Sequence, residues 1–100
     1  MYDYGVGSVQ DYNEAVHWYR SAAQQGDVGA QFNLGFMYAD GKGVLRDNVY
    51  AHMWLNVAAS KGFERAANKR DELARSMTAT AISKAQELAR ECVKKSYTGC

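Results

Sequence analysis

The sequence predicts an all-α protein, a short α-solenoid in which antiparallel helix pairs stack and a last helix closes the array. Three observations predict it. The chain of 100 residues contains no proline, and alanine, the best helix former, is abundant. One residue pattern occurs twice, and a period of about 20–50 residues is typical of stacked repeats. The apolar members of this pattern stand three and four positions apart, as on one face of a helix.

The repeat appears when the chain is shifted by 36 positions. Residues 1–30 then lie against residues 37–66 without a gap, and eleven of the thirty pairs are identical. The identical pairs are Met1/Met37, Tyr2/Tyr38, Gly5/Gly41, Gly7/Gly43, Asp11/Asp47, Ala15/Ala51, Trp18/Trp54, Ala22/Ala58, Ala23/Ala59, Gly26/Gly62 and Ala30/Ala66. Beyond this point the match stops, so a third unit begins and then diverges.

The repeated residue types fit a unit of helix, glycine turn and second helix. Small alanines let a neighbouring helix approach, and we expect both tryptophans to fill the core between helices. A glycine after the last helical turn ends a helix in the left-handed conformation, as expected for Gly26 and Gly62. The other repeated glycines punctuate the turn, and Asp11 and Asp47 are placed to cap the second helix of each unit.

We therefore expect helices at about 12–25, 28–39, 48–60, 63–75 and 78–95. Thr78 is the expected N-cap of the last helix. That helix has one apolar stripe and one charged face, as expected of a helix that closes a solenoid. The stripe consists of Ile82, Ala85, Leu88, Ala89 and Cys92.

The stretch "NLGFMYADGKGVLRDNVYAHMWLNVAASKG" (residues 33–62) resembles a Sel1-like repeat, a relative of the tetratricopeptide repeat. The matching positions are Leu34, Gly35, Tyr38, Gly41, Gly43, Val44, Asp47, Ala51, Trp54, Ala58, Ala59 and Gly62. The resemblance covers roughly residues 1–75, and the tail resembles the helical cap of bacterial members. It implies one domain over residues 1–100, with a truncated repeat (1–26), a complete repeat (27–62), and a degenerate repeat with capping helix (63–100).

Composition excludes several classes of function. The net charge is +1 and no basic stripe is present, which argues against a nucleic-acid partner. No apolar run approaches the ~20 residues of a membrane span. The first residues lack the pattern of a signal peptide, which favours the cytoplasm, although a trimmed export signal would leave the same sequence.

The two cysteines lie near the C-terminus and do not make a disulfide framework. Cys92 stands on an apolar stripe and is expected to be a buried thiol. Cys100 is expected to be more exposed and more reactive. A Cys92–Cys100 bond, or an intermolecular one, requires an oxidising setting.

No catalytic, metal-binding or cofactor-binding pattern is present. His17 and His52 lack ligands at the spacing of a zinc site. The glycines at 41–44 have neither the spacing nor the preceding strand of a phosphate-binding loop. A small enzyme that uses Glu14, His17 or Cys100 is the least favoured alternative.

The helix at 28–39 is apolar on both sides. Ala30, Leu34 and Met37 share one face, and Val28, Phe32, Phe36 and Ala39 share nearly the opposite one. A helix of this kind is buried on both sides or presents one side to a partner. Resemblance to tetratricopeptide arrays implies that the first helix of a unit lines the partner groove. The implied groove residues are Gly29, Phe32, Phe36 and Asp40, and the alternative is that the phenylalanines pack against adjacent units.

These observations together favour a non-catalytic module that binds a protein or peptide partner. The alternative is a self-associating structural protein. The helix at 12–25 has no upstream partner in its truncated repeat, and an uncovered face invites a homodimer.

Overall fold

The structure, a computed structural model, describes residues 12–100, and these form helices and turns only. The helices are α1 (Tyr12–Gln24), α2 (Val28–Asp40), α3 (Asn48–Ala59), α4 (Glu64–Ala74) and α5 (Ala79–Lys94). They agree within one residue at each end with the ranges expected from the sequence. The all-α prediction is confirmed.

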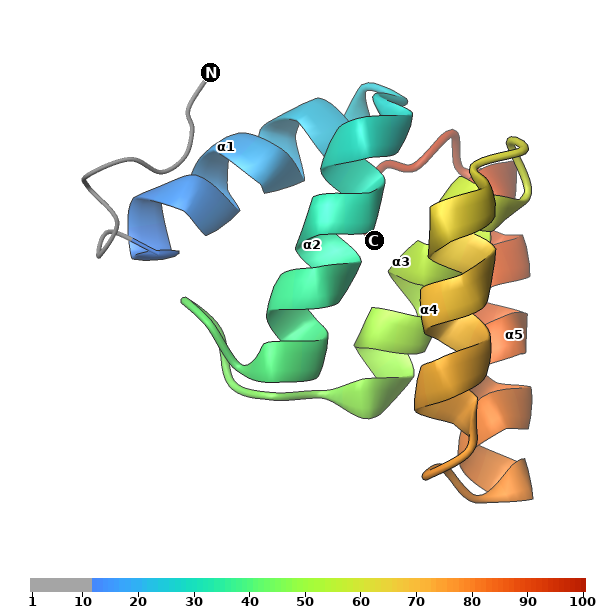
Figure 1. Cartoon of the computed structure of the whole chain (residues 1–100). Coiled ribbons are helices and arrows are strands. Elements are labelled where there is room, and N and C mark those ends of the chain that lie inside the picture. The colour runs from blue at the N-terminus through green and yellow to red at the C-terminus, as the bar shows by residue number, and fades with distance from the viewer. Residues whose placement is uncertain (1–11) are drawn as a thin grey trace.

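Helix α3 is the centre of the array. It packs against α2, α4 and α5, while α1 packs against α2. Figure 1 shows α1 at one edge, and α4 and α5, which run in opposite directions, at the other. The last helix therefore closes the array by covering α3.

The helix ends follow the residue types that the sequence places there. Asp47 accepts a hydrogen bond from the backbone N–H of Tyr50 (3.0 Å), and Thr78 accepts one from that of Ala81 (3.1 Å). Both residues are N-caps, as predicted. Gly26 and Gly62 have φ of 93° and 90°, so the left-handed helix ends are confirmed. The predicted roles of Asp11, Gly5 and Gly7 lie outside the described residues.

The core consists of two clusters on opposite sides of α2 and α3. The first surrounds Trp54 and Leu34 and extends to α1 and α5. The second, here called the α3–α4 cluster, joins α2, α3 and α4. Its members are Phe32, Leu55, Ala58 and Ala66, with Val28, Phe36, Ala59, Phe63 and Leu73 packed around them. A helix that is apolar on both sides is thus buried on both sides.

Gly35 sets the distance between α2 and α3. A Cβ atom at this position would lie 2.9 Å from Leu55 Cγ and 3.2 Å from the carbonyl oxygen of Ala51. These separations are too short for an ordinary contact, so any side chain here would push the two helices apart. The Leu-Gly pair of the repeat is therefore a packing requirement.

The expectation of an exposed, reactive Cys100 is wrong. Cys100 is 8% exposed and forms a disulfide with Cys92, with 5.6 Å between the two Cα atoms. The chain reverses after α5 because Ser96 and Tyr97 adopt left-handed conformations, with φ of 55° and 68°. The backbone N–H of Tyr97 donates to the carbonyl of Cys92 (2.8 Å). The last residues thus fold back toward α2 (Figure 1).

Candidate interaction surface

The two repeat-equivalent tryptophans have opposite environments. Trp54 on α3 is 0% exposed, whereas Trp18 on α1 is 62% exposed. The expectation that both lie in the core is therefore wrong for Trp18. The difference comes from the neighbouring helices. Trp54 packs in a cluster with Ala89 and Cys92 of α5. Within residues 12–100, no helix covers the corresponding side of α1.

Beside Trp18 lies an open groove between α1 and α2, with a volume of about 810 Å³. Small and aromatic side chains make up most of its lining, together with two acidic residues. The lining residues are Glu14, Ala15, Trp18, Tyr19, Ala22, Asp27, Gly29, Ala30 and Asn33. This surface is here called the α1–α2 groove.

A second, more polar hollow of about 450 Å³ lies on the other side of Trp18. His17, Ser21 and Gln24 contribute to it. The guanidinium of Arg20, also at this hollow, donates to the hydroxyl of Tyr38 (2.9 Å) and so is held against α2. Trp18 therefore lines both the α1–α2 groove and this polar hollow.

The structure does not bring the four groove residues expected from the sequence together. Gly29 lines the α1–α2 groove. Phe32 is 8% exposed and packs edge-on against Phe63, with 5.1 Å between the ring centroids. Phe36 and Asp40 instead line a separate small hollow near Met37. Phe32 is thus a core residue, and a partner contact at Phe36 and Asp40 stays a prediction.

Basic side chains from α4 cover the phenylalanines of α2. Arg65 lies over the ring of Phe32, at 5.5 Å from its centroid. Lys69 Nζ lies 4.6 Å from the centroid of the Phe36 ring. Such cation–π contacts hold a cation at the face of an aromatic ring. The Phe32–Phe36 side of α2 is therefore already occupied by this chain's own residues.

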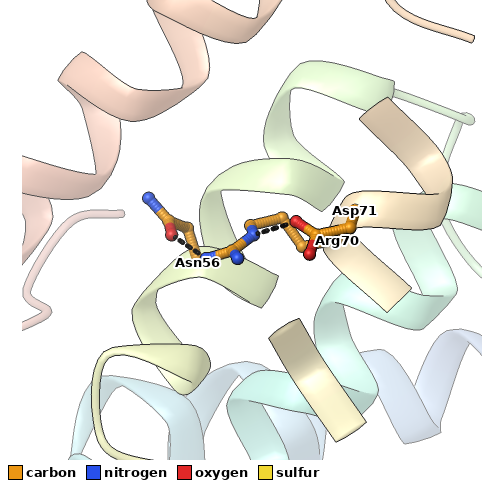
Figure 2. A network of polar contacts seen from close by, with 3 residues as sticks. All are labelled: Asn56, Arg70 and Asp71. Atoms are coloured by element: carbon orange, nitrogen blue, oxygen red, sulfur yellow. Dashed lines mark hydrogen bonds and ion pairs between the residues drawn. The ribbon is translucent and has the colours of Figure 1, made fainter. Parts of the chain in front are cut away.

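A buried histidine and a polar network lie at the junction of α3 and α4. His52 is 3% exposed, and its burial, reinforced by the charge of Arg70, lowers its pKa. Arg70 donates from Nη1 to Asn56 Oδ1 (2.8 Å) and from Nε to Asp71 Oδ1 (3.0 Å). Figure 2 shows this link from α4 to α3. The arrangement joins the two helices and is structural in character.

The described residues hold neither a metal-binding cluster nor a membrane-spanning helix. Among residues 12–100, no three His, Cys, Asp or Glu side chains gather in a way that could hold a metal ion. Over the same residues, no helix is both long and apolar enough to cross a membrane.

The repeat and its fold agree with a known family. The Sel1 repeat family matches the chain at residues 1–27 and 28–63. The chain belongs to the Sel1 repeat family. Sel1 repeats generally mediate protein–protein interactions, and the second matched segment contains α2, the glycine turn and α3.

Three curated relatives carry similar segments. A chitin synthase regulator of Saccharomyces cerevisiae is 45% identical over 60 residues, or 60% of this chain. Chitin synthase regulatory factor 3 of Schizosaccharomyces pombe is 40% identical over 67 residues, or 67% of the chain. An exopolysaccharide production negative regulator of Rhizobium leguminosarum bv. viciae is 43% identical over 51 residues, or 51% of the chain. The alignments span 9%, 7% and 19% of these relatives, so the similarity concerns the Sel1 segment.

Of the residues that line the α1–α2 groove, only Gly29 was predicted from the sequence as a partner contact. The exposure of Trp18 was not predicted, because its identity with Trp54 in the repeat says nothing of the helices that surround it.

Proposed function

We propose that this Sel1 domain is a non-catalytic binding module that docks a segment of a protein partner in the α1–α2 groove. The observation that carries the proposal is the 62% exposure of Trp18 at a position whose repeat counterpart is fully buried. Large aromatic side chains dominate the energetics of protein interfaces when they are buried on binding. An exposed tryptophan beside an apolar groove of about 810 Å³ has the character of such an anchor.

The relatives support a regulatory role without naming a partner for this chain. All three are described as regulators, two of chitin synthase and one of exopolysaccharide production. A domain that binds one protein and thereby controls another fits those descriptions. We therefore extend the proposal to a regulatory or scaffolding role, in which binding rather than chemistry is the output.

The test compares Trp18→Ala with a matched surface substitution. Leu45 is 90% exposed in the turn after α2 and does not line the groove, so Leu45→Ala is the control. Proteins from the source cells are captured on the wild-type domain and on both variants and identified by mass spectrometry. We expect a set of proteins that wild type and Leu45→Ala retain and Trp18→Ala loses. An identical set on all three, or none, would contradict the proposal.

A second candidate function is self-association through the same groove. It is favoured by the exposure of Trp18 beside an apolar surface, because a two-fold dimer would bury this surface on both copies. Light-scattering mass at several protein concentrations tests it. A dimer that Trp18→Ala dissociates would favour this candidate, and a monomer at all concentrations would remove it.

A further inference from the structure

The turn that follows α5 lies against the turn that joins α1 and α2. A Cβ atom added to Gly26 would lie 3.5 Å from Cε2 of the Tyr97 ring. Lys61, from the turn after α3, contacts both residues. Its Nζ lies 4.3 Å from the centroid of the Tyr97 ring and donates to the carbonyl of Gly26 (2.7 Å). The turns after α1, α3 and α5 thus meet, and the C-terminal trace runs from α5 toward α2 (Figure 1).

This junction holds the C-terminal end of α1. Among the described residues, α1 packs chiefly against α2, and no other helix contacts it to a comparable extent. The core cluster around Trp54 also contains Ala23 of α1 together with Cys92 and Cys100. Lys61 places a positive charge at the end of α1, where the partial charge of a helix is negative. The C-terminal turn therefore adds to the attachment that α2 gives to α1.

The turn after α5 has the hydrogen bonds of a Schellman helix end without the glycine that such an end usually contains. The backbone N–H of Tyr97 donates to the carbonyl of Cys92 (2.8 Å), and that of Ser96 to the carbonyl of Val93 (3.0 Å). Ser96 and Tyr97 take φ of 55° and 68°. Residues with a Cβ atom adopt this left-handed conformation only at a cost in free energy. The closed turn is therefore strained, and the disulfide between Cys92 and Cys100 holds it closed.

Most of α5 packs independently of the disulfide. Ala85 and Ala89, which come earlier in the helix, are buried, and Ala89 lies in the same core cluster as Trp54 of α3. The loop that the disulfide closes has a sequence separation of 8, so opening it frees only the residues after α5. An opening of this kind is local. The helices remain while the contact of Tyr97 with Gly26 is lost.

From these observations we propose that the Cys92–Cys100 disulfide is a redox-sensitive clasp, which holds the α1–α2 turn in the oxidised protein and releases it in the reduced one. Strain in the closed turn favours reduction, since strained disulfides are reduced more easily. The position of the C-terminal end of α1 then follows the redox state. This device does not depend on which surface of the domain binds a partner.

The reductant is a dithiol. One of its thiolates attacks the sulfur of Cys100, the less buried of the two cysteines, and the sulfur of Cys92 leaves as a thiolate that takes up a proton. The second thiol of the reductant then attacks the mixed disulfide, and the sulfur of Cys100 leaves and is protonated in turn. Two electrons and two protons thus pass to the protein, and the reductant becomes a disulfide.

The test is nuclear magnetic resonance of the isotope-labelled full-length protein before and after reduction with dithiothreitol. We expect the amide signals of Gly26 and Lys61 to shift, because both residues lose the ring of Tyr97. Ser96 and Tyr97 should become mobile on the nanosecond timescale. The signals of α4 and the helical circular dichroism should stay unchanged, and reoxidation should restore the first spectrum. Gly26 and Lys61 are distant in sequence from both cysteines, so their shifts do not arise from the change at sulfur itself.

Two variants test whether the ring of Tyr97 transmits the change. Tyr97→Ala keeps both cysteines but removes the ring. In this variant, oxidised, we expect the signals of Gly26 and Lys61 to lie near their positions in the reduced wild type. The control is Thr98→Ala, because Thr98 is an exposed residue of the same turn. It should leave both signals in place.

Ser96→Gly tests the strain in the turn. Glycine adopts the left-handed conformation at little cost, so the turn should persist after reduction, and the signal of Gly26 should shift less than in the wild type. The closed turn also keeps the two thiols close together. We therefore expect this variant to need a ratio of dithiol to its disulfide about fivefold higher for half reduction.

Four results would overturn the proposal. The first is a fully reduced protein in which the signals of Gly26 and Lys61 have not moved. The second is an oxidised Tyr97→Ala protein whose Gly26 and Lys61 signals match those of the oxidised wild type. The third is loss of the helical signal on reduction, which would mean that the disulfide holds the whole fold. The fourth is a disulfide that dithiothreitol reduces only in denaturant, or as easily in Ser96→Gly as in the wild type.

Discussion

The α1–α2 groove and the α3–α4 cluster are built from the same repeated residues, yet one is surface and the other is core. Ala58 and Leu55 are 0% exposed, while their counterparts Ala22 and Tyr19 line an open groove. The alanines are identical in the two places, so they do not account for the difference; the α3–α4 cluster is covered by α2 and has Phe63 where the groove has Asp27. In a stacked array each unit buries the face of its neighbour. Whether a residue of the repeat is buried therefore depends on the helices around it and not on the repeat motif alone.

The largest expected change in stability comes from replacing each of the two tryptophans in turn. Trp54→Ala leaves a large cavity in a fully buried site, and such truncations typically cost ~3–5 kcal/mol of unfolding free energy. Trp18→Ala removes a side chain that is mostly in solvent, and we expect a change within about 0.5 kcal/mol. Urea unfolding followed by circular dichroism measures both.

A control at Trp54 separates the loss of side-chain volume from the loss of the polar indole N–H. Among the described residues, the indole N–H of Trp54 has no hydrogen-bond partner, so Trp54→Phe should cost much less than Trp54→Ala. Equal and large losses from Trp18→Ala and Trp54→Ala would mean that the face of α1 is covered as α3 is, and the contrast between the two sites would be lost.

Most of the fold was predictable because its signals are local. The N-caps Asp47 and Thr78 and the glycines after α1 and α3 act within one turn of chain, and they fixed the helix ends to within a residue. The environment of Trp18 was not predictable in this way, since the identity with Trp54 says nothing of which helices are present nearby. The burial of Cys100 likewise depends on the turn at Ser96 and Tyr97, where two non-glycine residues take positive φ.

The phenylalanines of α2 give a second test, within the α3–α4 cluster. Phe32 is buried in the α3–α4 cluster and Phe36 packs at its edge. Phe32→Ala should therefore cost ~3–5 kcal/mol, and Phe36→Ala clearly less, because part of its ring is already exposed. This expectation replaces the idea that both residues line a partner groove without supporting the fold. Similar unfolding midpoints for the two variants would contradict it.

The C-terminal disulfide is expected to have a smaller effect. It closes a loop with a sequence separation of 8, for which chain entropy gives a stabilisation of about 2–3 kcal/mol. It also holds Tyr97 beside Lys61, whose Nζ lies 4.3 Å from the ring centroid and donates to the carbonyl of Gly26 (2.7 Å). Reduction with a dithiol should thus lower the unfolding free energy by about this amount.

The control is the double variant Cys92→Ala and Cys100→Ala, whose stability should not respond to the reductant. Thiol counting on the native protein should give no free cysteine. Such a bond persists in an oxidising compartment, so two free thiols in protein isolated from its own cells would agree with the cytoplasmic expectation from the sequence and contradict the disulfide.

The smallest expected effect concerns His52, whose counterpart in the first repeat is Val16. Burial lowers the pKa of His52, and the positive charge of Arg70 lowers it further. The charge of Asp71 acts in the opposite direction, and the pKa is lowered overall. In the unfolded chain the pKa of histidine is about 6.5. As the pH falls below that value, the unfolded state takes up a proton that the folded state resists, so the unfolding free energy should decrease until the pH reaches the lowered pKa.

Each unit by which the pKa is lowered corresponds to about 1.4 kcal/mol. Urea unfolding at pH 7.5, 6.5 and 5.5 measures the slope. His52→Val, which places the residue of the first repeat in the second, should remove this part of the pH dependence. Arg70→Gln should reduce it, since the repelling charge is gone while burial remains. A slope that His52→Val leaves unchanged would mean that the junction of α3 and α4 tolerates a charged imidazole. The packing between these two helices would then be more open to water than the burial of His52 indicates.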